Sequence, residues 1–169
     1  MSRGVKRFTD LRAWQTCRDY KLAVYRTVLD SPLCRDWRRR DQLERSVAGP
    51  PAHVAEGFGR FNPTDSARFC VTARASLMES QNHLIDAVDK GYITEAQRAD
   101  LDALCVVALK EVTGWMEYLH SEEALRNARR ARERRIASRA ERRASTRGAS
   151  NQEPNPEPEH EPRTQKPEA

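Results

Sequence analysis

QLERSVAGPPAHVAEGFGR, residues 42–60, is the stretch that decides the fold. Its apolar side chains recur at the spacing of one face of an α-helix, namely Leu43, Val47, Val54 and Phe58. Pro50 and Pro51 interrupt that face, and proline inside a helix costs about 3 kcal/mol. Either one helix is bent at the prolines and held by packing, or a second helix starts with Gly49 as N-cap and Pro50 as first residue. The apolar face keeps its phase across the prolines, which favours one bent helix.

The end of this stretch combines two glycines with a pair of opposite charges. Gly57 and Gly59 are expected to end the helix, because glycine commonly follows the last helical residue. Glu56 lies near that end, where a negative charge is unfavourable. Arg60 is four residues further on, the spacing at which Glu and Arg pair on a helix. We interpret Glu56 as part of a structural latch rather than a ligand contact, with two further candidate partners, Arg45 and Arg74.

Two helices are expected in the N-terminal half. Thr9 or Asp10 can cap the first helix, because both side chains accept hydrogen bonds from free backbone N–H groups. Its apolar residues follow helical periodicity and include Leu11, Trp14, Cys17, Leu22, Val24, Tyr25, Val28 and Leu29. Ser31-Pro32 is expected to break it, because the residue before proline avoids the α region. The second helix is expected to open at Asp36.

The third and fourth helices have clear start and stop signals. Asn62-Pro63 predicts an N-cap and first helical residue, and Gly91 predicts the end of the third helix. Thr94 and Gln97 have the spacing of a capping box. The fourth helix then carries apolar residues at alternating steps of three and four: Leu101, Leu104, Ala108, Val112, Trp115 and Leu119. Four such helices with short connections predict an all-α, up-down antiparallel four-helix bundle.

The chain is expected to have three parts with different charge: the bundle over residues 1–121, an arginine-rich extension over 122–147 and a tail over 148–169. The net charge of the chain is +5, and residues 122–147 alone carry ten arginines and four glutamates. The extension has strong helix formers but no apolar face, so it is marginal alone and could either continue the fourth helix or order on a partner. The Pro- and Glu-rich tail is expected to be disordered.

Cysteine usage and hydropathy point to the cytoplasm. No apolar run approaches the roughly 18 residues of a membrane span, and no signal-peptide pattern is visible at the N-terminus. The four cysteines form no CxxC pair, and three of them lie in helical patterns as small buried thiols expected to stay reduced: Cys17, Cys70 and Cys105. We therefore expect a cytoplasmic protein.

No residue pattern predicts catalysis, a metal site or a cofactor. A di-iron bundle needs Glu-x-x-His on two helices, and only Glu117 with His120 fits within the expected bundle. Glu157 with His160 fits the spelling but lies in the tail. The GFGR run lacks the residues of a phosphate-binding loop. We expect a protein that is not an enzyme and has no cofactor.

Residues 51–60, PAHVAEGFGR, resemble the PANIAEGFGR segment of the proteins encoded in 23S ribosomal RNA intervening sequences. That family is similar to the accessory variability determinant of diversity-generating retroelements. Three positions depart from the family pattern: Glu44 replaces an arginine, His53 an asparagine and Pro50 an aliphatic residue. Further matches, in order along the chain, are Phe8, Asp10, Leu11, Trp14, Tyr25, Gln42, Leu43, Arg45, Phe69, Ala75, Ser76, Leu77, Glu79, Gly91, Tyr92 and Ile93.

The resemblance covers roughly residues 6–120 and implies a four-helix bundle. Relatives form barrel-shaped homopentamers that bind nucleic acid and a reverse transcriptase, so it also implies a homopentamer with those partners. The residues expected to have a structural role are Trp14, Pro51, Glu56, Gly57 and Gly59.

Basic charge concentrates in the second and third helices and in the extension. Residues 35–74 carry eight arginines against five acids, whereas residues 93–119 carry two basic residues against five acids. Positive charge that can follow phosphates is what nucleic-acid binding needs, and arginine suits bidentate phosphate contact. The predicted nucleic-acid-binding residues are Arg38, Arg39, Arg40, Arg45, Arg60, Arg68, Arg74, Arg126, Arg129 and Arg130.

Three hypotheses follow from these patterns. The first is a non-enzymatic, oligomeric scaffold that binds RNA or DNA and acts as an accessory factor to a reverse transcriptase. The alternative is a protein–protein interaction module that uses its apolar seams and acidic fourth helix, without direct nucleic-acid binding. An enzyme is the third and lacks any supporting constellation. If these basic residues have no binding role, residues 38–40 form a solvated first turn and residues 122–147 form a solubilising tail.

Overall fold

The computed structural model of the chain describes residues 5–150, with side chains from 5 to 143. Within residues 5–150 the protein is all-α and contains no strand. Two short 3-10 helices, η1 (Phe8–Asp10) and η2 (Pro32–Arg35), accompany five α-helices. The α-helices are α1 (Arg12–Leu29), α2 (Trp37–Phe58), α3 (Pro63–Asp89), α4 (Glu95–His120) and α5 (Glu122–Ser150).

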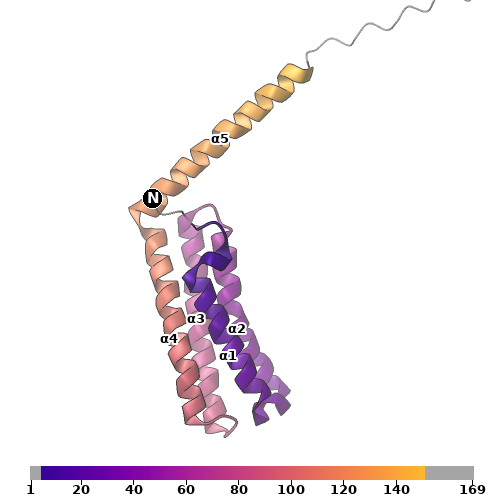
Figure 1. Cartoon of the computed structure of the whole chain (residues 1–169), viewed down its shortest axis with the longest axis vertical. Coiled ribbons are helices and arrows are strands. Elements are labelled where there is room, and N and C mark those ends of the chain that lie inside the picture. The colour runs from indigo at the N-terminus through magenta and orange to yellow at the C-terminus, as the bar shows by residue number, and fades with distance from the viewer. Residues whose placement is uncertain (1–4, 151–169) are drawn as a thin grey trace, which may run out of the picture. The chain divides into compact units, whose positions relative to one another are not determined.

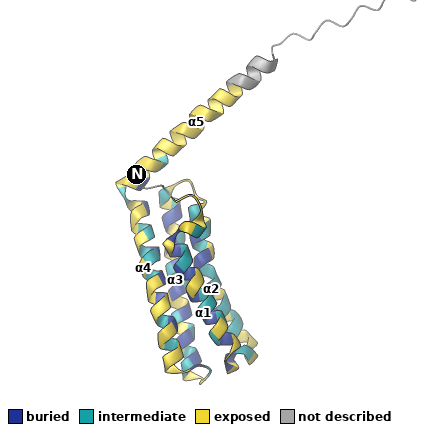
Figure 2. Ribbon diagram, in the orientation of Figure 1, coloured by how far each residue is buried: buried dark blue, intermediate teal, exposed yellow. Residues whose placement is uncertain are grey.

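Helices α1 to α4 lie side by side around one hydrophobic core (Figure 1). Helix α1 packs against α2 and α4, and α3 packs against the same two helices. Each of these four helices has buried residues, whose positions are dark blue on the ribbon in Figure 2. None of the described helices is both long and apolar enough to cross a membrane.

Helix α5 begins afresh after α4. Ser121 has extended backbone, with φ −71° and ψ 151°, and its Oγ accepts a hydrogen bond from the Ala124 N–H at 3.2 Å. The chain divides into two compact units, residues 1–130 and 131–169, and that division falls within α5. Of the predicted tail, 148–169, positions 151–169 lie outside the described residues.

Helix α2 runs without interruption through both prolines, which confirms the prediction of one helix. Pro50 and Pro51 are buried, as are Leu43, Val47 and Val54 on the same apolar face. Burial of this continuous face offsets the roughly 3 kcal/mol that a helical proline costs.

The prediction that Gly57 ends α2 is wrong. Gly57 is buried inside the helix, where an added Cβ would lie 3.0 Å from the Phe69 Cβ and 3.0 Å from the Ser66 carbonyl oxygen. Gly57 is therefore a point of close approach between α2 and α3. Gly59 follows the last helical residue as predicted, but with right-handed backbone, φ −72° and ψ −11°.

Most of the predicted helix boundaries are confirmed by hydrogen bonds. Asp36 caps α2 by accepting from the Arg39 N–H, and Asn62 caps α3 by accepting from the Thr64 N–H. Both halves of the capping box formed by Thr94 and Gln97 are present. Gly91 has φ +70°, which suits the end of α3. The exception is α1, which has no side-chain cap because Thr9 and Asp10 lie in η1.

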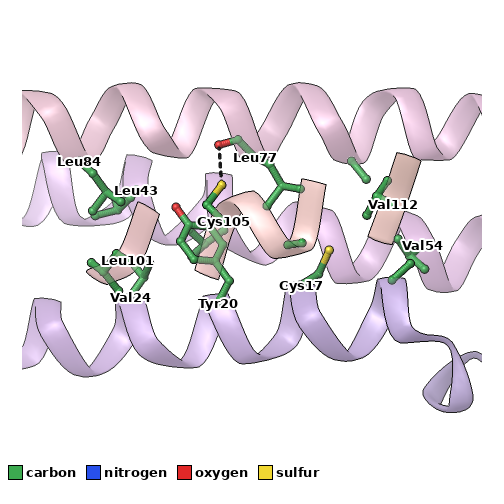
Figure 3. Packing of buried hydrophobic residues seen from close by; sticks show 14 of the residues in the cluster. Cys17, Tyr20, Val24, Leu43, Val54, Leu77, Leu84, Leu101, Cys105 and Val112 are labelled. Atoms are coloured by element: carbon green, nitrogen blue, oxygen red, sulfur yellow. Dashed lines mark hydrogen bonds between the residues drawn. The ribbon is translucent and has the colours of Figure 1, made fainter. Parts of the chain in front are cut away.

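The core contains one polar contact that periodicity does not predict. Tyr20 is fully buried, and its hydroxyl lies 2.8 Å from the Ser80 Oγ. In Figure 3 its ring lies beside Cys105, whose thiol donates to the Leu77 carbonyl at 3.7 Å. Burial raises the pKa of Tyr20 well above its usual range, so the phenol stays neutral.

The predicted buried thiols are confirmed, and two predicted core leucines are not. Burial raises the pKa of Cys17 to about 12, that of Cys70 to about 11 and that of Cys105 to about 12. Leu29 is 67% exposed at the end of α1, and Leu104 is 38% exposed because Cys105 occupies the inward position in its place.

Candidate nucleic-acid interface

Three predicted binding residues, Arg38, Arg39 and Arg40, occupy the first turn of α2. Arg39 Nη1 pairs with the carboxylate of Asp86 on α3. The Nε of Arg40 lies 3.6 Å from the Glu44 Oε1, an ion-pair distance too long for a hydrogen bond. Arg38 is exposed and makes no ion pair with the described residues. The three guanidinium groups therefore have different surroundings and do not form a single basic stripe.

Asp36 is the centre of a polar network at the start of α2. Tyr92, just after α3, donates its hydroxyl proton to Asp36 Oδ2 at 2.9 Å, and Arg39 Nε lies 3.4 Å from the same oxygen. The hydrogen bond from Tyr92, followed by that from the Arg39 backbone, lowers the pKa of the Asp36 carboxyl. Arg39 is thus bound between two carboxylates and acts mainly as a structural residue.

An open depression of about 440 Å³ lies beside the polar network of Asp36. The indole of Trp37 is 70% exposed at its edge, an unusual exposure for such a large apolar side chain. Sequence reasoning missed this feature, although the run Arg35-Asp36-Trp37-Arg38 places the indole between arginines. The residues that line the depression are Pro32, Arg35, Asp36, Trp37, Arg38 and Tyr92.

Two more predicted arginines pair with acids on their own helix. Arg45 Nε lies 2.9 Å from the Asp41 carboxylate, and Arg68 Nη1 lies 3.7 Å from that of Asp65. Both arginine side chains are 79% exposed, so these pairs are weak, worth about 0–1 kcal/mol. Such pairs lower the local positive charge without immobilising the guanidinium groups.

Arg60 makes the ion pair with Glu56 that its spacing predicts. The Arg60 Nη2 donates to the Glu56 Oε1 at 2.5 Å, and the guanidinium lies 4.8 Å from the centre of the Phe69 ring. These contacts connect the end of α2 to α3. Arg74 instead donates to the hydroxyl of Thr113 and so connects α3 to α4. Both arginines have a structural role in the bundle.

The predicted residues on α5 differ from those on the bundle. Arg126 Nη1 lies 3.2 Å from the Glu122 carboxylate, but Arg129 and Arg130 are exposed and make no ion pair with the described residues. Every described side chain from residue 131 to residue 143 is exposed. The candidate residues thus do not converge on one site, and the accessible positive charge concentrates on α5.

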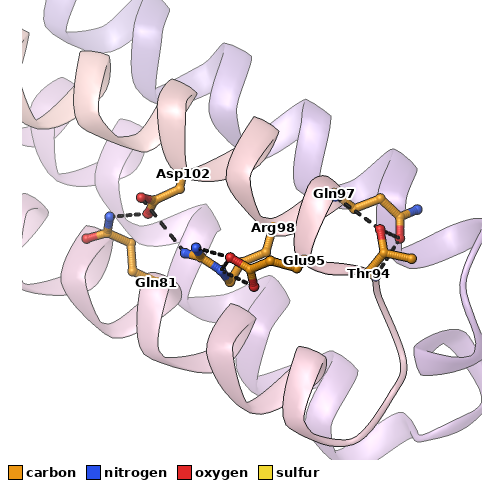
Figure 4. A network of polar contacts seen from close by, with 6 residues as sticks. All are labelled: Gln81, Thr94, Glu95, Gln97, Arg98 and Asp102. Atoms are coloured by element: carbon orange, nitrogen blue, oxygen red, sulfur yellow. Dashed lines mark hydrogen bonds and ion pairs between the residues drawn. The ribbon is translucent and has the colours of Figure 1, made fainter.

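Helix α4 presents the opposite charge. Arg98 is held by Glu95, with Nε 3.0 and 2.9 Å from its two oxygens, and its Nη1 lies 4.0 Å from Asp102 (Figure 4). The hydrogen bond from Arg98 lowers the pKa of Glu95. Gln81 of α3 donates to Asp102 at 2.5 Å. Since its arginine is already paired, α4 offers little positive charge to phosphates.

Exposed apolar side chains occupy α3 and α4. Val71, Met78 and Ile85 recur every seven residues, so they line one face of α3, with exposed fractions of 58%, 58% and 49%. Val106 and Val107 are exposed on α4. Large apolar surfaces on soluble proteins commonly mark interaction sites.

Potential metal ligands do not cluster in this region. Among the described residues, no group of three or more His, Cys, Asp or Glu side chains could hold an ion. Glu117 and His120, the one Glu-x-x-His pair on the bundle, lie in the last turn of α4.

A comparison with protein families matches residues 9–114 to the 23S rRNA-intervening sequence protein. The chain belongs to this family. The match covers more than half of the chain, includes the PAHVAEGFGR stretch and confirms the resemblance inferred from it. It ends within α4, so α5 lies outside the part that matches this family. A search of curated proteins finds no match.

Proposed function

We propose that the chain is an up-down four-helix bundle with a basic helical extension, and that it serves as a non-enzymatic, oligomeric scaffold for nucleic acid in the cytoplasm. The observation that carries this proposal is the composition and exposure of α5. Residues 122–147 carry ten arginines and four glutamates, and the described arginines of α5 are all exposed. A dense set of exposed arginines attracts phosphates through a strong, sequence-independent electrostatic term.

The ion pairs of the bundle give its arginines a secondary part in binding. Six of the ten predicted binding residues pair with carboxylates: Arg39, Arg40, Arg45, Arg60, Arg68 and Arg126. Exposed pairs are weak, and phosphates compete for them, but each carboxylate cancels charge that a phosphate would otherwise meet. The extension is therefore the main binding element, and the bundle arginines supplement it.

An exposed apolar surface supports the oligomeric part of the proposal. The exposed apolar face of α3, formed by Val71, Met78 and Ile85, is a surface that a second copy of the chain could cover. Assembly multiplies the number of α5 helices available to one nucleic acid and so raises avidity. The family resemblance suggests a homopentamer and a reverse transcriptase as partner, as in relatives.

A binding titration tests the proposal. Purified full-length chain is titrated into labelled RNA and DNA, each in single- and double-stranded form, at salt concentrations from 50 to 300 mM. We expect binding at low salt and a linear fall of log K with log salt, whose slope reports the number of phosphates contacted. Failure to bind any of the four probes at the lowest salt refutes the proposal.

A protein-interaction module is the second candidate function. It is favoured by the exposed apolar face of α3 and by the acidic, already paired surface of α4. Affinity capture before and after nuclease treatment separates the two functions. Protein partners that remain after nuclease, together with no binding in the titration, would support this module instead of the scaffold.

A further inference from the structure

The charged residues of α5 sort onto two faces. An α-helix turns about 100° per residue, which fixes the direction of each side chain around the axis. One face, here called the arginine face, covers an arc of about 100° beyond residue 130 and contains no acid. Its described members are Arg132, Arg135, Arg139, Arg142 and Arg143.

The opposite face mixes both signs. It covers an arc of about 120° and is here called the mixed face. Its arginines are outnumbered by glutamates, so its net charge is slightly negative. The members are Glu122, Glu123, Arg126, Arg130, Glu133, Arg134 and Glu141. The Glu122–Arg126 ion pair, at 3.2 Å, lies on this face.

We propose that the arginine face of α5 binds the phosphates of a double-stranded nucleic acid without regard to base sequence. This inference rests on the function proposed above and assigns its element and its class of ligand. From Arg132 to Arg143 the face spans about 16 Å, close to the rise of five base pairs of duplex. A straight row of cations suits a stiff, highly charged backbone.

The composition of α5 argues against two other polyanions, single-stranded nucleic acid and an anionic lipid surface. Single-strand binders stack bases on aromatic side chains, and residues 122–143 contain no aromatic residue. A helix that lies on a lipid surface needs a broad apolar face, whereas the large apolar residues of this segment are Leu125 and Ile136 alone. Among the side chains described up to residue 143, the arginine face offers no other polar group for base recognition, so binding is expected to be independent of sequence.

Two variants with equal net charge test the assignment to one face. The first, Arg132→Gln/Arg139→Gln/Arg143→Gln, removes three charges from the arginine face. The second, Arg126→Gln/Arg130→Gln/Arg134→Gln, removes three from the mixed face. Glutamine and arginine have similar helix propensity, so both variants are expected to stay helical. Circular dichroism of each full-length variant checks this.

Duplex affinity is expected to separate the variants. In 0.1 M salt, the arginine-face variant should bind a 20-base-pair duplex about tenfold or more weakly than the unmodified chain, and its salt slope should fall by about 2.7, or 0.9 for each lost contact. The mixed-face variant should lose less than about threefold, because the four glutamates of that face leave its net charge slightly negative. A single strand of the same length should bind more weakly than the duplex.

The possible failures are distinguishable. Equal losses in the two variants would overturn the assignment to one face while leaving nucleic-acid binding intact. Preference for the single strand, or equal affinity for anionic lipid vesicles, would overturn the choice of a duplex. No binding of the unmodified chain to any nucleic acid would refute the proposed function itself.

Discussion

Replacing Gly57 with alanine tests the helix contact on which the bundle depends. Alanine is normally the better helix former, by about 1 kcal/mol. At Gly57, however, the added methyl group would lie 3.0 Å from the Phe69 Cβ and 3.0 Å from the Ser66 carbonyl oxygen. Neither atom can be moved by a side-chain rotation, because one is backbone and the other is attached directly to it. Relief therefore requires α2 and α3 to separate.

The cost follows from the packing of a buried position. An extra methyl group forced into a packed core costs about 1–3 kcal/mol, which exceeds the gain in helix propensity. The difference between the two effects predicts that Gly57→Ala lowers the free energy of unfolding by up to about 2 kcal/mol, and urea denaturation followed by circular dichroism measures it.

Gly114 provides the matched control. It lies inside α4, is exposed, and an added Cβ would meet no atom within 4 Å. Gly114→Ala should therefore raise the free energy of unfolding by about 0.5–1 kcal/mol. If Gly57→Ala were as stable as Gly114→Ala, the close approach of α2 and α3 would not exist in solution.

Three further predictions concern the core, the surface and pH. Tyr20→Phe should lower the free energy of unfolding by about 0.5–1.5 kcal/mol, the net contribution of one hydrogen bond, because the Ser80 hydroxyl loses Tyr20 but still donates to the Leu77 carbonyl. A double-mutant cycle with Ser80→Ala should show coupling, and strict additivity would argue against the contact. Met78→Lys/Ile85→Lys should reduce the mass measured by light scattering, whereas the charge-matched variant Asn82→Lys/Ala99→Lys, at two exposed positions, should reduce it less. An unchanged mass in the first variant would exclude the α3 face from self-association. The folded-state pKa values of Cys17 and Cys105 are raised from 9.0 to about 12, so the thiols of the unfolded chain lose their protons first as pH rises. The free energy of unfolding should therefore fall as pH rises above about 9. Urea midpoints at pH 8 and pH 10 measure this fall, and Cys17→Ala/Cys105→Ala should make it smaller.

The sequence predicts local features of the fold well because their signals are local. The caps at Asn62 and Thr94 and the left-handed Gly91 each depend on residues within three or four positions. The same holds for the ion pair of Glu56 with Arg60. Gly57 shows the limit of this reasoning, since a glycine that ends a helix and one that admits a neighbouring helix look alike until the position of α3 is known.

Contacts between distant residues account for what the sequence could not predict. Arg39 pairs with Asp86, and Tyr92 bonds to Asp36, across separations of 47 and 56 residues. No spacing rule connects such positions. The sequence therefore predicts that Arg39 is available to bind phosphates, whereas the structure pairs it with Asp36 and Asp86. Tyr20 was missed for a similar reason, because its partner Ser80 lies on another helix, 60 residues away.

The position of acids relative to arginines distinguishes the bundle from α5. On α2, acids stand four residues from arginines, as in Arg40 with Glu44 and Asp41 with Arg45, so charges of opposite sign meet on one face. On α5 the same residue types are placed so that the glutamates lie away from the arginine face. Composition alone would rank both helices as basic. Helical register shows that no glutamate of α5 falls on the arginine face, and for that reason α5 is the element on which phosphate binding should depend.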